Sequence, residues 1–251
     1  MTGVTTDPLA PLLELADIAA AVEAARDQID QALRHRALRR NGGQVAAEVG
    51  LRSAIASAAL EGAAYEREAV RAGTVTDPVV QGALRVAGAL PGLSDLWPKA
   101  PRQALARLHV LAARDVVPAE ELGRPVTDPL VAARLETLAG LVAGGSATSP
   151  LVLAAVVHGE LLALRPFAGP SAVVARAAAR LTLLSSGLDP RGLVGVDIGH
   201  LERQPEYVGA ARAFATGTPD GIRSWLRHYT AAVEVAAAQL VEIGDEVLAG
   251  V

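Results

Sequence analysis

HGELLALRPFAGPSAVVARAAARL, residues 158–181, joins two apolar helical runs through one short turn. The first run ends in Arg-Pro-Phe, an Ala-Gly-Pro-Ser turn follows, and the second run carries Arg176 and Arg180 one helical turn apart. The start of a helix is a common place for an anion, because its first amides have no partner within the helix. Few of the groups that an anion prefers surround this turn. It is therefore either a phosphate site or what is left of one.

Helical patterns continue on both sides of this stretch. Thr76-Asp77-Pro78 and Thr127-Asp128-Pro129 are each typical of a helix N-cap with proline in the first turn. Residues 189–200 are the one stretch with the character of a short strand. Apolar residues at helical spacing predict helices over residues 16–37, 44–61, 77–90, 102–114, 128–143, 150–164, 171–187 and 219–248. The sequence therefore predicts an all-α fold.

The composition supports the same fold class. Of the 251 residues 51% are hydrophobic but only 3% are aromatic, so the core must consist mainly of Ala, Leu and Val. Such a core suits helices that pack at short distance. A chain of this length can bury one large core, or one core with a small N-terminal addition. We expect a helical extension over residues 1–43 and one helical domain over residues 44–251.

Charge, cysteine content and hydropathy argue against several classes of protein. The net charge is −4 and no basic face is evident, which argues against a nucleic-acid partner. Without cysteine there are no disulfides and no cysteine-based zinc site. The first residues lack the features of a secretion signal, and no apolar run reaches the roughly 18–20 residues of a membrane span. We expect a cytoplasmic protein without a membrane partner. Lys99, the single lysine among many arginines, indicates a bacterial origin.

Neither a metal site nor an activated nucleophile is evident. The five histidines are His35, His109, His158, His200 and His228, and none has the spacing of a metal ligand set. His109 and His158 lie within apolar helical runs, which favours core positions over catalytic ones. Ser57 and Ser171 have no neighbouring histidine and aspartate to activate them. We therefore predict no metal.

Glu61 is unusual for its position. It lies in the last turn of a predicted helix, where the helix dipole disfavours a negative charge by roughly 0.3–1 kcal/mol. Its neighbours in SAALEGAA, residues 57–64, are small and apolar, which is typical of a buried helix end. Such a glutamate either stays in solvent or has a cationic partner, because a buried unpaired charge is costly.

Residues 150–187 resemble the core of the Fic/Fido family, whose signature is H-P-F-x-[DE]-G-N-[GK]-R-x-x-R between two helices. The signature covers residues 165–176 without a gap, and Pro166, Phe167 and Arg176 match it. The family's inhibitory helix motif, [ST]-x-x-x-E-[GN], is matched in full by Ser57, Glu61 and Gly62. The later stretch EYVGAARAFATGTPDGIRSWLRHY, residues 206–229, is similar to the family's last conserved stretch. The resemblance therefore extends over about residues 45–230 and implies a Fic/Fido-like helical domain with an inhibitory-type helix.

Several signature positions differ in this chain. Arg165 replaces the histidine that takes a proton from the target hydroxyl, and arginine cannot act as a base because its pKa stays above about 12. Gly169 replaces the acidic magnesium ligand, and Val173 replaces the first, phosphate-binding arginine. The other differences are Pro170, Ser171 and Ala172 in place of the signature's glycine, asparagine and small residue. The resemblance thus implies no catalytic residue, and neither ATP nor magnesium is predicted as a cofactor.

The resemblance also implies which groups remain. We predict a buried ion pair between Glu61 and Arg176, because the family's inhibitory glutamate pairs with the second signature arginine. The sequence does not decide whether residues 116–127 keep the family's target-docking hairpin, although the segment is short and bounded by prolines. The predicted remnant of the pocket consists of Arg165, Pro166, Phe167, Gly169, Ser171, Arg176 and Arg180.

Several functions are compatible with these residues. The one most favoured is a binding or regulatory module that lacks AMP transfer and has a protein partner or a small anionic ligand. The alternatives are an enzyme that uses Arg165, Arg176 and Arg180 to bind a phosphate or carboxylate for other chemistry, residual AMP transfer through another base, and nucleotide binding without turnover. A homodimer is compatible with each of these functions.

Overall fold

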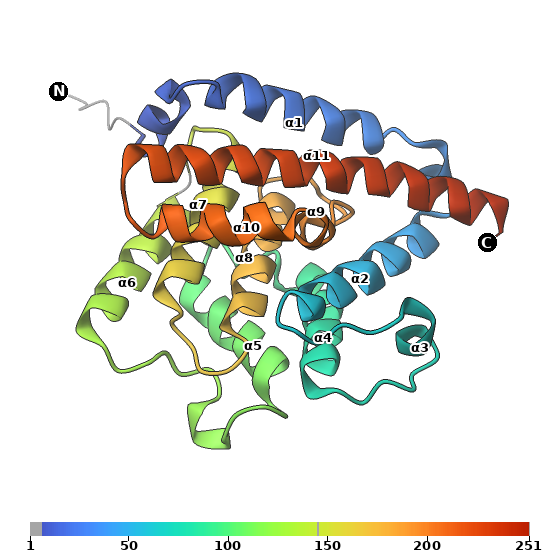
Figure 1. The fold of residues 1–251 in the computed structure, drawn as a ribbon, viewed down its shortest axis with the longest axis horizontal. Coiled ribbons are helices and arrows are strands. Elements are labelled where there is room, and N and C mark those ends of the chain that lie inside the picture. Colours follow the sequence, from blue (N-terminus) through green and yellow to red (C-terminus); the bar gives the residue numbers. More distant parts are fainter. Residues whose placement is uncertain (1–6, 145, 251) are drawn as a thin grey trace.

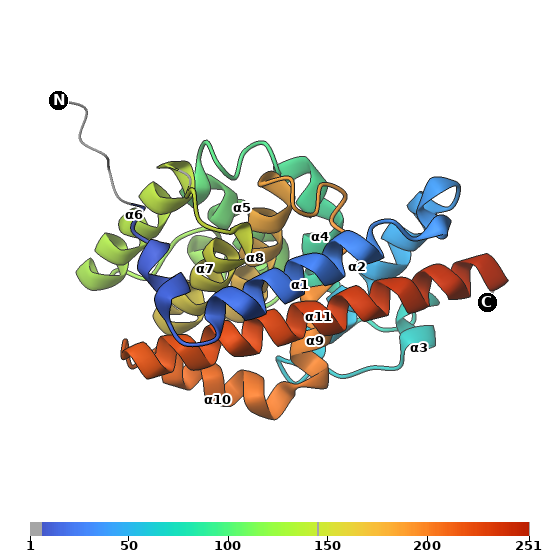
Figure 2. The ribbon, with the colours of Figure 1, turned by 90° about the horizontal axis from the view of Figure 1, so that it is seen from above.

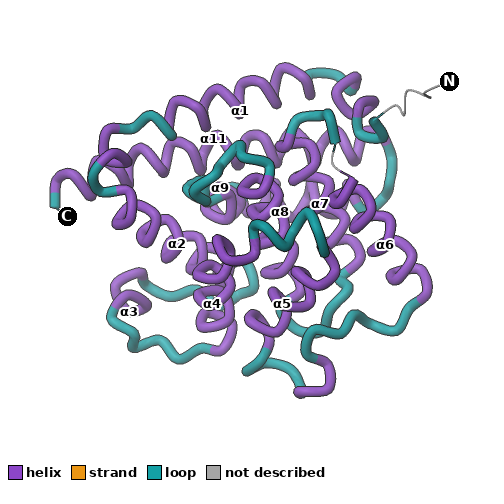
Figure 3. The backbone as a smooth tube through the Cα atoms, turned by 180° about the vertical axis from the view of Figure 1, so that it is seen from behind, coloured by secondary structure: helices purple, strands orange, loops and turns teal. Residues whose placement is uncertain are grey.

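A computed structural model of the chain describes residues 7–144 and 146–250. These residues form helices and loops and contain no strand, so the predicted all-α class is confirmed (Figure 3). The α-helices are α1 (Ile18–Ala32), α2 (Gly42–Ala59), α3 (Arg67–Arg71), α4 (Pro78–Leu93), α5 (Pro101–Ala113), α6 (Pro129–Gly144), α7 (Pro150–Leu164), α8 (Ser171–Ser185), α9 (Val196–Glu202), α10 (Gln204–Phe214) and α11 (Pro219–Ala249). The short 3₁₀ helices are η1 (Ala10–Glu14), η2 (Arg36–Arg39) and η3 (Ala119–Glu121). Within the described residues, no helix has the combination of length and apolarity that crossing a membrane requires.

The two central helices, α7 and α8, pack against each other and are surrounded by the others (Figure 1). α1 and α11 lie side by side along one edge of the molecule, and the view from above shows the same neighbours (Figure 2). α10 and α9 pack beneath α11, while α2, α4 and α5 form the opposite side of the core. This arrangement confirms the predicted pair of helices, although the turn expected over residues 165–172 ends at residue 170, before α8 begins.

Proline and side-chain caps fix where several helices begin. Asp77 Oδ1 accepts hydrogen bonds from Val79 N–H at 2.9 Å and Val80 N–H at 3.1 Å, so α4 begins at the predicted N-cap. Asp128 Oδ1 caps α6 in the same way, with Leu130 N–H at 2.7 Å. Both predicted N-caps are therefore confirmed.

Small residues allow the helices to approach closely, as the low aromatic content predicts. A Cβ atom at Gly82 of α4 would lie 2.2 Å from Ala112 O of α5. At Gly199 of α9, a Cβ atom would lie 2.0 Å from Ala232 O of α11. Backbone thus packs directly on backbone at both crossings, and we expect an alanine at either position to separate the helices.

Some predicted boundaries were wrong. The helix expected over residues 16–37 is divided into α1 and η2, and α4 continues past the predicted end at residue 90. Residues 189–200 contain no strand. Buried Asp189 accepts hydrogen bonds from Leu193 N–H at 2.9 Å and Val194 N–H at 2.8 Å, and these bonds form a turn that leads into α9. The expected boundary between residues 43 and 44 falls in the first turn of α2, and α1 buries its apolar face in the same core as α7 and α8.

Candidate functional site

The turn between α7 and α8 contains two residues with left-handed backbone. Arg165 is the C-cap of α7 with φ at 46°, and Gly169 has φ at 65°. This conformation costs a residue with a side chain roughly 1–2 kcal/mol, whereas glycine adopts it freely. A Cβ atom at Gly169 would also lie 2.8 Å from Val117 Cγ1. Position 169 therefore cannot take a side chain unless its surroundings shift.

His109 of α5 holds the turn from the core side. Its ring stacks on Phe167 with ring centroids 4.6 Å apart. Its Nδ1 accepts a hydrogen bond from Gly123 N–H at 3.0 Å, so the ring proton is on Nε2, which donates to Ala168 O at 2.9 Å. Burial lowers the pKa of His109, partly opposed by the bond to Ala168. Both ring nitrogens have structural partners, which confirms the predicted core position.

Some amides at the start of α8 are not available to an anion. Ser171 N–H donates to Gly169 O at 2.8 Å, and Val173 N–H donates to Pro170 O at 3.1 Å. Pro170, the N-cap, has no N–H, and no side chain caps this helix. A phosphate cradle needs several amides that point at the anion together. Here two amides are already bound and proline removes a third.

Arg176 of α8 is buried, with a side chain that is 2% exposed, and is surrounded by oxygen atoms. Its Nε donates to Ser57 Oγ at 2.8 Å, and its Nη2 donates to Ser57 O at 2.9 Å and to Glu61 Oε1 at 2.8 Å. Its Nη1 donates to Tyr207 Oη at 3.3 Å, and Asp197 Oδ1 lies 3.7 Å from Nε. Burial alone would lower the pKa of Arg176, but the oxygens of Tyr207, Glu61 and Asp197 more than offset it and raise the pKa above its ordinary value.

The predicted ion pair between Glu61 and Arg176 is therefore present, although its two ends differ in exposure. The glutamate side chain is 23% exposed while the arginine is 2% exposed, so the pair is only partly shielded from solvent. Gly62, with φ at 90°, and the hydrogen bond from Ala63 N–H to Ala58 O at 3.0 Å end the helix and turn the chain away. This ending presents the Glu61 carboxylate to α8.

A pocket of about 350 Å³ opens beside this ion pair, between the α7–α8 turn and α10. Arg165 and Arg212 line it, are exposed, and have no carboxylate oxygen within 4.0 Å among the described residues. Glu61 is the sole carboxylate in the lining. Ser171 Oγ, also in the lining, is buried and has no hydrogen-bond partner in the described part of the chain. The pocket thus combines two free cations with one carboxylate that is already paired.

Similarity in three dimensions extends over nearly the whole chain, although no family model matches it and no curated protein matches it in sequence. A Fic family protein from Desulfovibrio desulfuricans G20 aligns with a TM-score of 0.72 at 19% identity, over 90% of this chain and 75% of that one. Fic-1 from C. elegans (residues 134–508) aligns with a TM-score of 0.71 at 19% identity, over 92% of this chain and 74% of that one. The chain has the Fic/Fido fold.

In this Fic/Fido fold the predicted remnant residues are not all together. Arg165, Gly169, Ser171 and Arg176 line the 350 Å³ pocket. Three others lie elsewhere: Pro166 and Phe167 are buried in the turn, and Arg180 points toward α9, with Nη1 3.6 Å from Asp197 Oδ2 and Nη2 donating to Gly192 O at 3.3 Å.

Two pocket residues, Tyr207 and Arg212, were missed because both are on α10. No side chain caps the start of that helix, and the Fic/Fido signature at residues 165–176 does not include any of its residues. The one available signal for Tyr207 was its place in the stretch that resembles the last conserved segment of the Fic/Fido family.

Residues 116–127, where the family's target-docking hairpin would lie, form a loop with η3 and no strand. Val126 N–H donates to Pro166 O at 2.8 Å, so this loop is attached to the α7–α8 turn. The question that the sequence left open is thus answered for this segment: it contains no β-hairpin.

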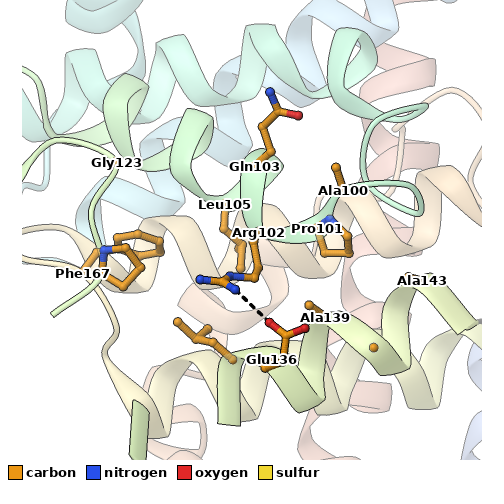
Figure 4. A pocket seen from close by; sticks show the side chains of 13 residues that line it. Ala100, Pro101, Arg102, Gln103, Leu105, Gly123, Glu136, Ala139, Ala143 and Phe167 are labelled. Atoms are coloured by element: carbon orange, nitrogen blue, oxygen red, sulfur yellow. Dashed lines mark hydrogen bonds and ion pairs between the residues drawn. The ribbon is translucent and has the colours of Figure 1, made fainter. Parts of the chain in front are cut away.

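A second hollow, of about 630 Å³, lies between α5 and α6 on the other side of the turn (Figure 4). Phe167, Leu105 and Leu135 contribute an apolar wall. Arg102 Nη1 donates to Glu136 Oε2 at 2.8 Å across it, so its two charged side chains neutralise each other. Its lining contains no free charged group, and the smaller pocket is therefore the candidate site.

Proposed function

We propose that this Fic/Fido-fold chain does not transfer AMP and acts as a binding or regulatory module through the 350 Å³ pocket. The observation that carries the proposal is the backbone of the α7–α8 turn. The signature's acidic position is Gly169, where positive φ and the nearby Val117 side chain disfavour any larger residue. A magnesium ion prefers carboxylate oxygens, and this position cannot supply one without rearrangement.

The other chemical groups of the signature are also unavailable to a nucleotide. Arg165 offers only N–H donors and no acceptor for a proton. Val173, at the first arginine position, is 2% exposed and adjoins Val86 and Leu90 of α4, so an arginine there would enter the core. Arg176 already donates to four oxygen atoms. The pocket therefore offers no free base, and neither signature arginine position supplies a free guanidinium for a phosphate.

Labelled ATP tests the proposal. The full chain, incubated with magnesium and ATP labelled in the adenosine moiety, should incorporate no label into itself or into added protein. The triple variant Arg165→His, Gly169→Asp, Glu61→Gly should also remain unlabelled, because Val173 and the bound amides are unchanged. A melting curve of each variant shows whether it is folded. Labelling of the unmodified chain, above a heat-denatured control, would refute the proposal.

The free charges of Arg165 and Arg212 favour a small anion as the ligand of this pocket over an uncharged molecule. Guanidinium groups bind carboxylate and phosphate through two parallel hydrogen bonds. AMP and inorganic phosphate are suitable probes in calorimetric titration. Arg165→Ala with Arg212→Ala should weaken binding about tenfold or more, since two charge-assisted contacts are lost. If this variant binds the probes as tightly as the unmodified chain does, the two arginines do not bind a small anion, and a protein partner becomes the favoured ligand.

A further inference from the structure

Five arginines gather at the far end of α1, away from the candidate site. The segment RHRALRR, residues 34–40, contributes Arg34, Arg36, Arg39 and Arg40, and Arg191 joins them from the loop before α9. All five are exposed. None has a carboxylate oxygen within 4.0 Å among the described residues, not even Arg34, which lies one turn after Asp30. The sequence expectation that the chain has no basic face is therefore wrong.

The absence of a carboxylate partner distinguishes these five arginines from most of the others in the described part of the chain. Most arginines outside the segment form ion pairs, as Arg134 does with Glu160 at 2.7 Å and Arg223 with Asp17 at 2.8 Å. Cations placed together repel one another, so the cluster costs free energy when no anion is present. An anion from outside the chain would remove this repulsion.

Three of these arginines surround a hollow of about 380 Å³. Arg34 and Arg39 line one side, and Arg191 lines the other. Leu33, Leu38 and Pro190 add an apolar surface. The volume lies within the range of small-molecule sites, which combine apolar walls with a few polar groups.

The backbone that carries these arginines is held in place by the fold. His35 packs directly on α11: a Cβ atom at Gly244 would lie 2.3 Å from its Nδ1, and its Nε2 lies 3.3 Å from Asp245 Oδ1. Arg191 Nη1 donates to Leu38 O at 3.3 Å, which ties the two walls together. The loop that contains Arg191 is closed by Asp189, whose carboxylate accepts hydrogen bonds from the N–H groups of Leu193 and Val194. Fixed walls reduce the entropy that binding must overcome.

We propose that this hollow, lined by residues 33–35, 38–39 and 190–191, binds a small phosphate ester. A phosphate monoester carries a charge of about −1.5 to −2 at pH 7 and three acceptor oxygens, which matches three guanidinium groups around one cavity. A single carboxylate would neutralise only one of them. The apolar surface of Leu33, Leu38 and Pro190 takes the organic part of the ester. Because the cations enclose a hollow, a compact ligand fits better than an extended strand of nucleic acid.

Calorimetric titration of the full chain with phenyl phosphate, and with benzoate as the singly charged comparison, tests the proposal. Phenyl phosphate should bind at least about tenfold more tightly than benzoate, and binding should weaken as salt rises, because exposed charges are screened. Arg34→Ala with Arg39→Ala should reduce the affinity about tenfold or more; neither side chain has a hydrogen bond in the described structure, so folding should be unaffected. Arg26→Ala with Arg107→Ala removes the same charge from exposed positions outside the hollow and is the matched control.

Each other outcome overturns the proposal. Loss of binding in the variant Arg165→Ala, Arg212→Ala but not in Arg34→Ala, Arg39→Ala would assign the phosphate to the α7–α8 pocket. Equal loss in the control pair would show a nonspecific charge effect. Affinity for a single-stranded oligonucleotide that grows with its length, or binding to vesicles rich in phosphatidylserine but not to phenyl phosphate, would show an extended polyanion surface instead of a small-molecule site.

Discussion

Removing Glu61 should destabilise the protein less than removing Arg176, although the two residues form one ion pair. Without Glu61, Arg176 keeps Ser57 Oγ at 2.8 Å, Ser57 O at 2.9 Å and Tyr207 Oη at 3.3 Å, with Asp197 at 3.7 Å. Only one charge-assisted hydrogen bond is lost, from a carboxylate that is 23% exposed. We expect Glu61→Ala to lower the free energy of unfolding by about 1–3 kcal/mol.

Arg176→Met removes the donor that all of these oxygens share. Asp197, with a side chain that is 5% exposed, then keeps only Arg180, at 3.6 Å, as a cationic neighbour. Ser57 Oγ and Tyr207 each lose a buried donor. Because buried polar groups are left without partners, we expect a loss of about 3–5 kcal/mol.

Urea unfolding measures both losses, since Trp97 and Trp225 are buried and their fluorescence reports global unfolding. The double variant Glu61→Ala, Arg176→Met completes the cycle, and we expect a coupling free energy of about 1–2 kcal/mol. Glu66→Ala is the control: Glu66 is exposed, has no ion pair among the described residues, and should change stability by less than about 0.5 kcal/mol. Equal losses for the two single variants, or zero coupling, would refute this account of the network.

Three further predictions concern pH and the turn. Burial lowers the pKa of His228 to about 4 and those of His158 and His200 well below their ordinary value, so the unfolded chain binds more protons below about pH 6.5. The free energy of unfolding should therefore be highest above that pH. On acidification it should fall by up to about 1.4 kcal/mol per pH unit for each of these histidines. Urea midpoints that do not change from pH 7.5 to 5 would contradict this. Gly169→Asp should cost about 1–3 kcal/mol in the same assay, with Gly187→Asp, also at positive φ but with open space around it, as a comparison that costs less. Arg165→Gly should leave stability unchanged or raise it by about 1 kcal/mol, because the left-handed backbone suits glycine; a loss above 1 kcal/mol would reveal a structural role for this side chain.

Local patterns predicted the helices because helix formation depends on neighbours in sequence, whereas the pair of Glu61 and Arg176, 115 residues apart, followed from the resemblance to the Fic/Fido family. Asp77 and Asp128 cap the helices that follow them, and the motif from Ser57 to Gly62 places the Glu61 carboxylate just past the end of α2. Arg180 was misplaced for a geometric reason. Four residues turn an α-helix by about 400°, so its side chain is rotated by about 40° from Arg176 and lies one turn further along, beside Asp197.

Groups brought in from distant helices could not be predicted in this way. Tyr207 and Arg212 reach the pocket only because α10 packs beneath α11, and Asp197 reaches Arg176 only because α9 folds back on α2. The basic cluster was missed for another reason. A net charge of −4 averages over the whole chain and hides the arginines of residues 34–40.

Arg176 shows how a signature arginine can be needed without catalysis. Ser57, Tyr207 and Asp197 come from three different helices, and each presents a buried oxygen to the same guanidinium. No neutral side chain has enough donors to satisfy all of them, so changing Arg176 alone leaves several buried acceptors unpaired. Position 165 has no such partners: its side chain is exposed and makes no hydrogen bond within the described chain. Stability should therefore require Arg176 but not a particular residue at 165. If AMP transfer is absent, as we propose, the chain can keep Arg176 and change residue 165.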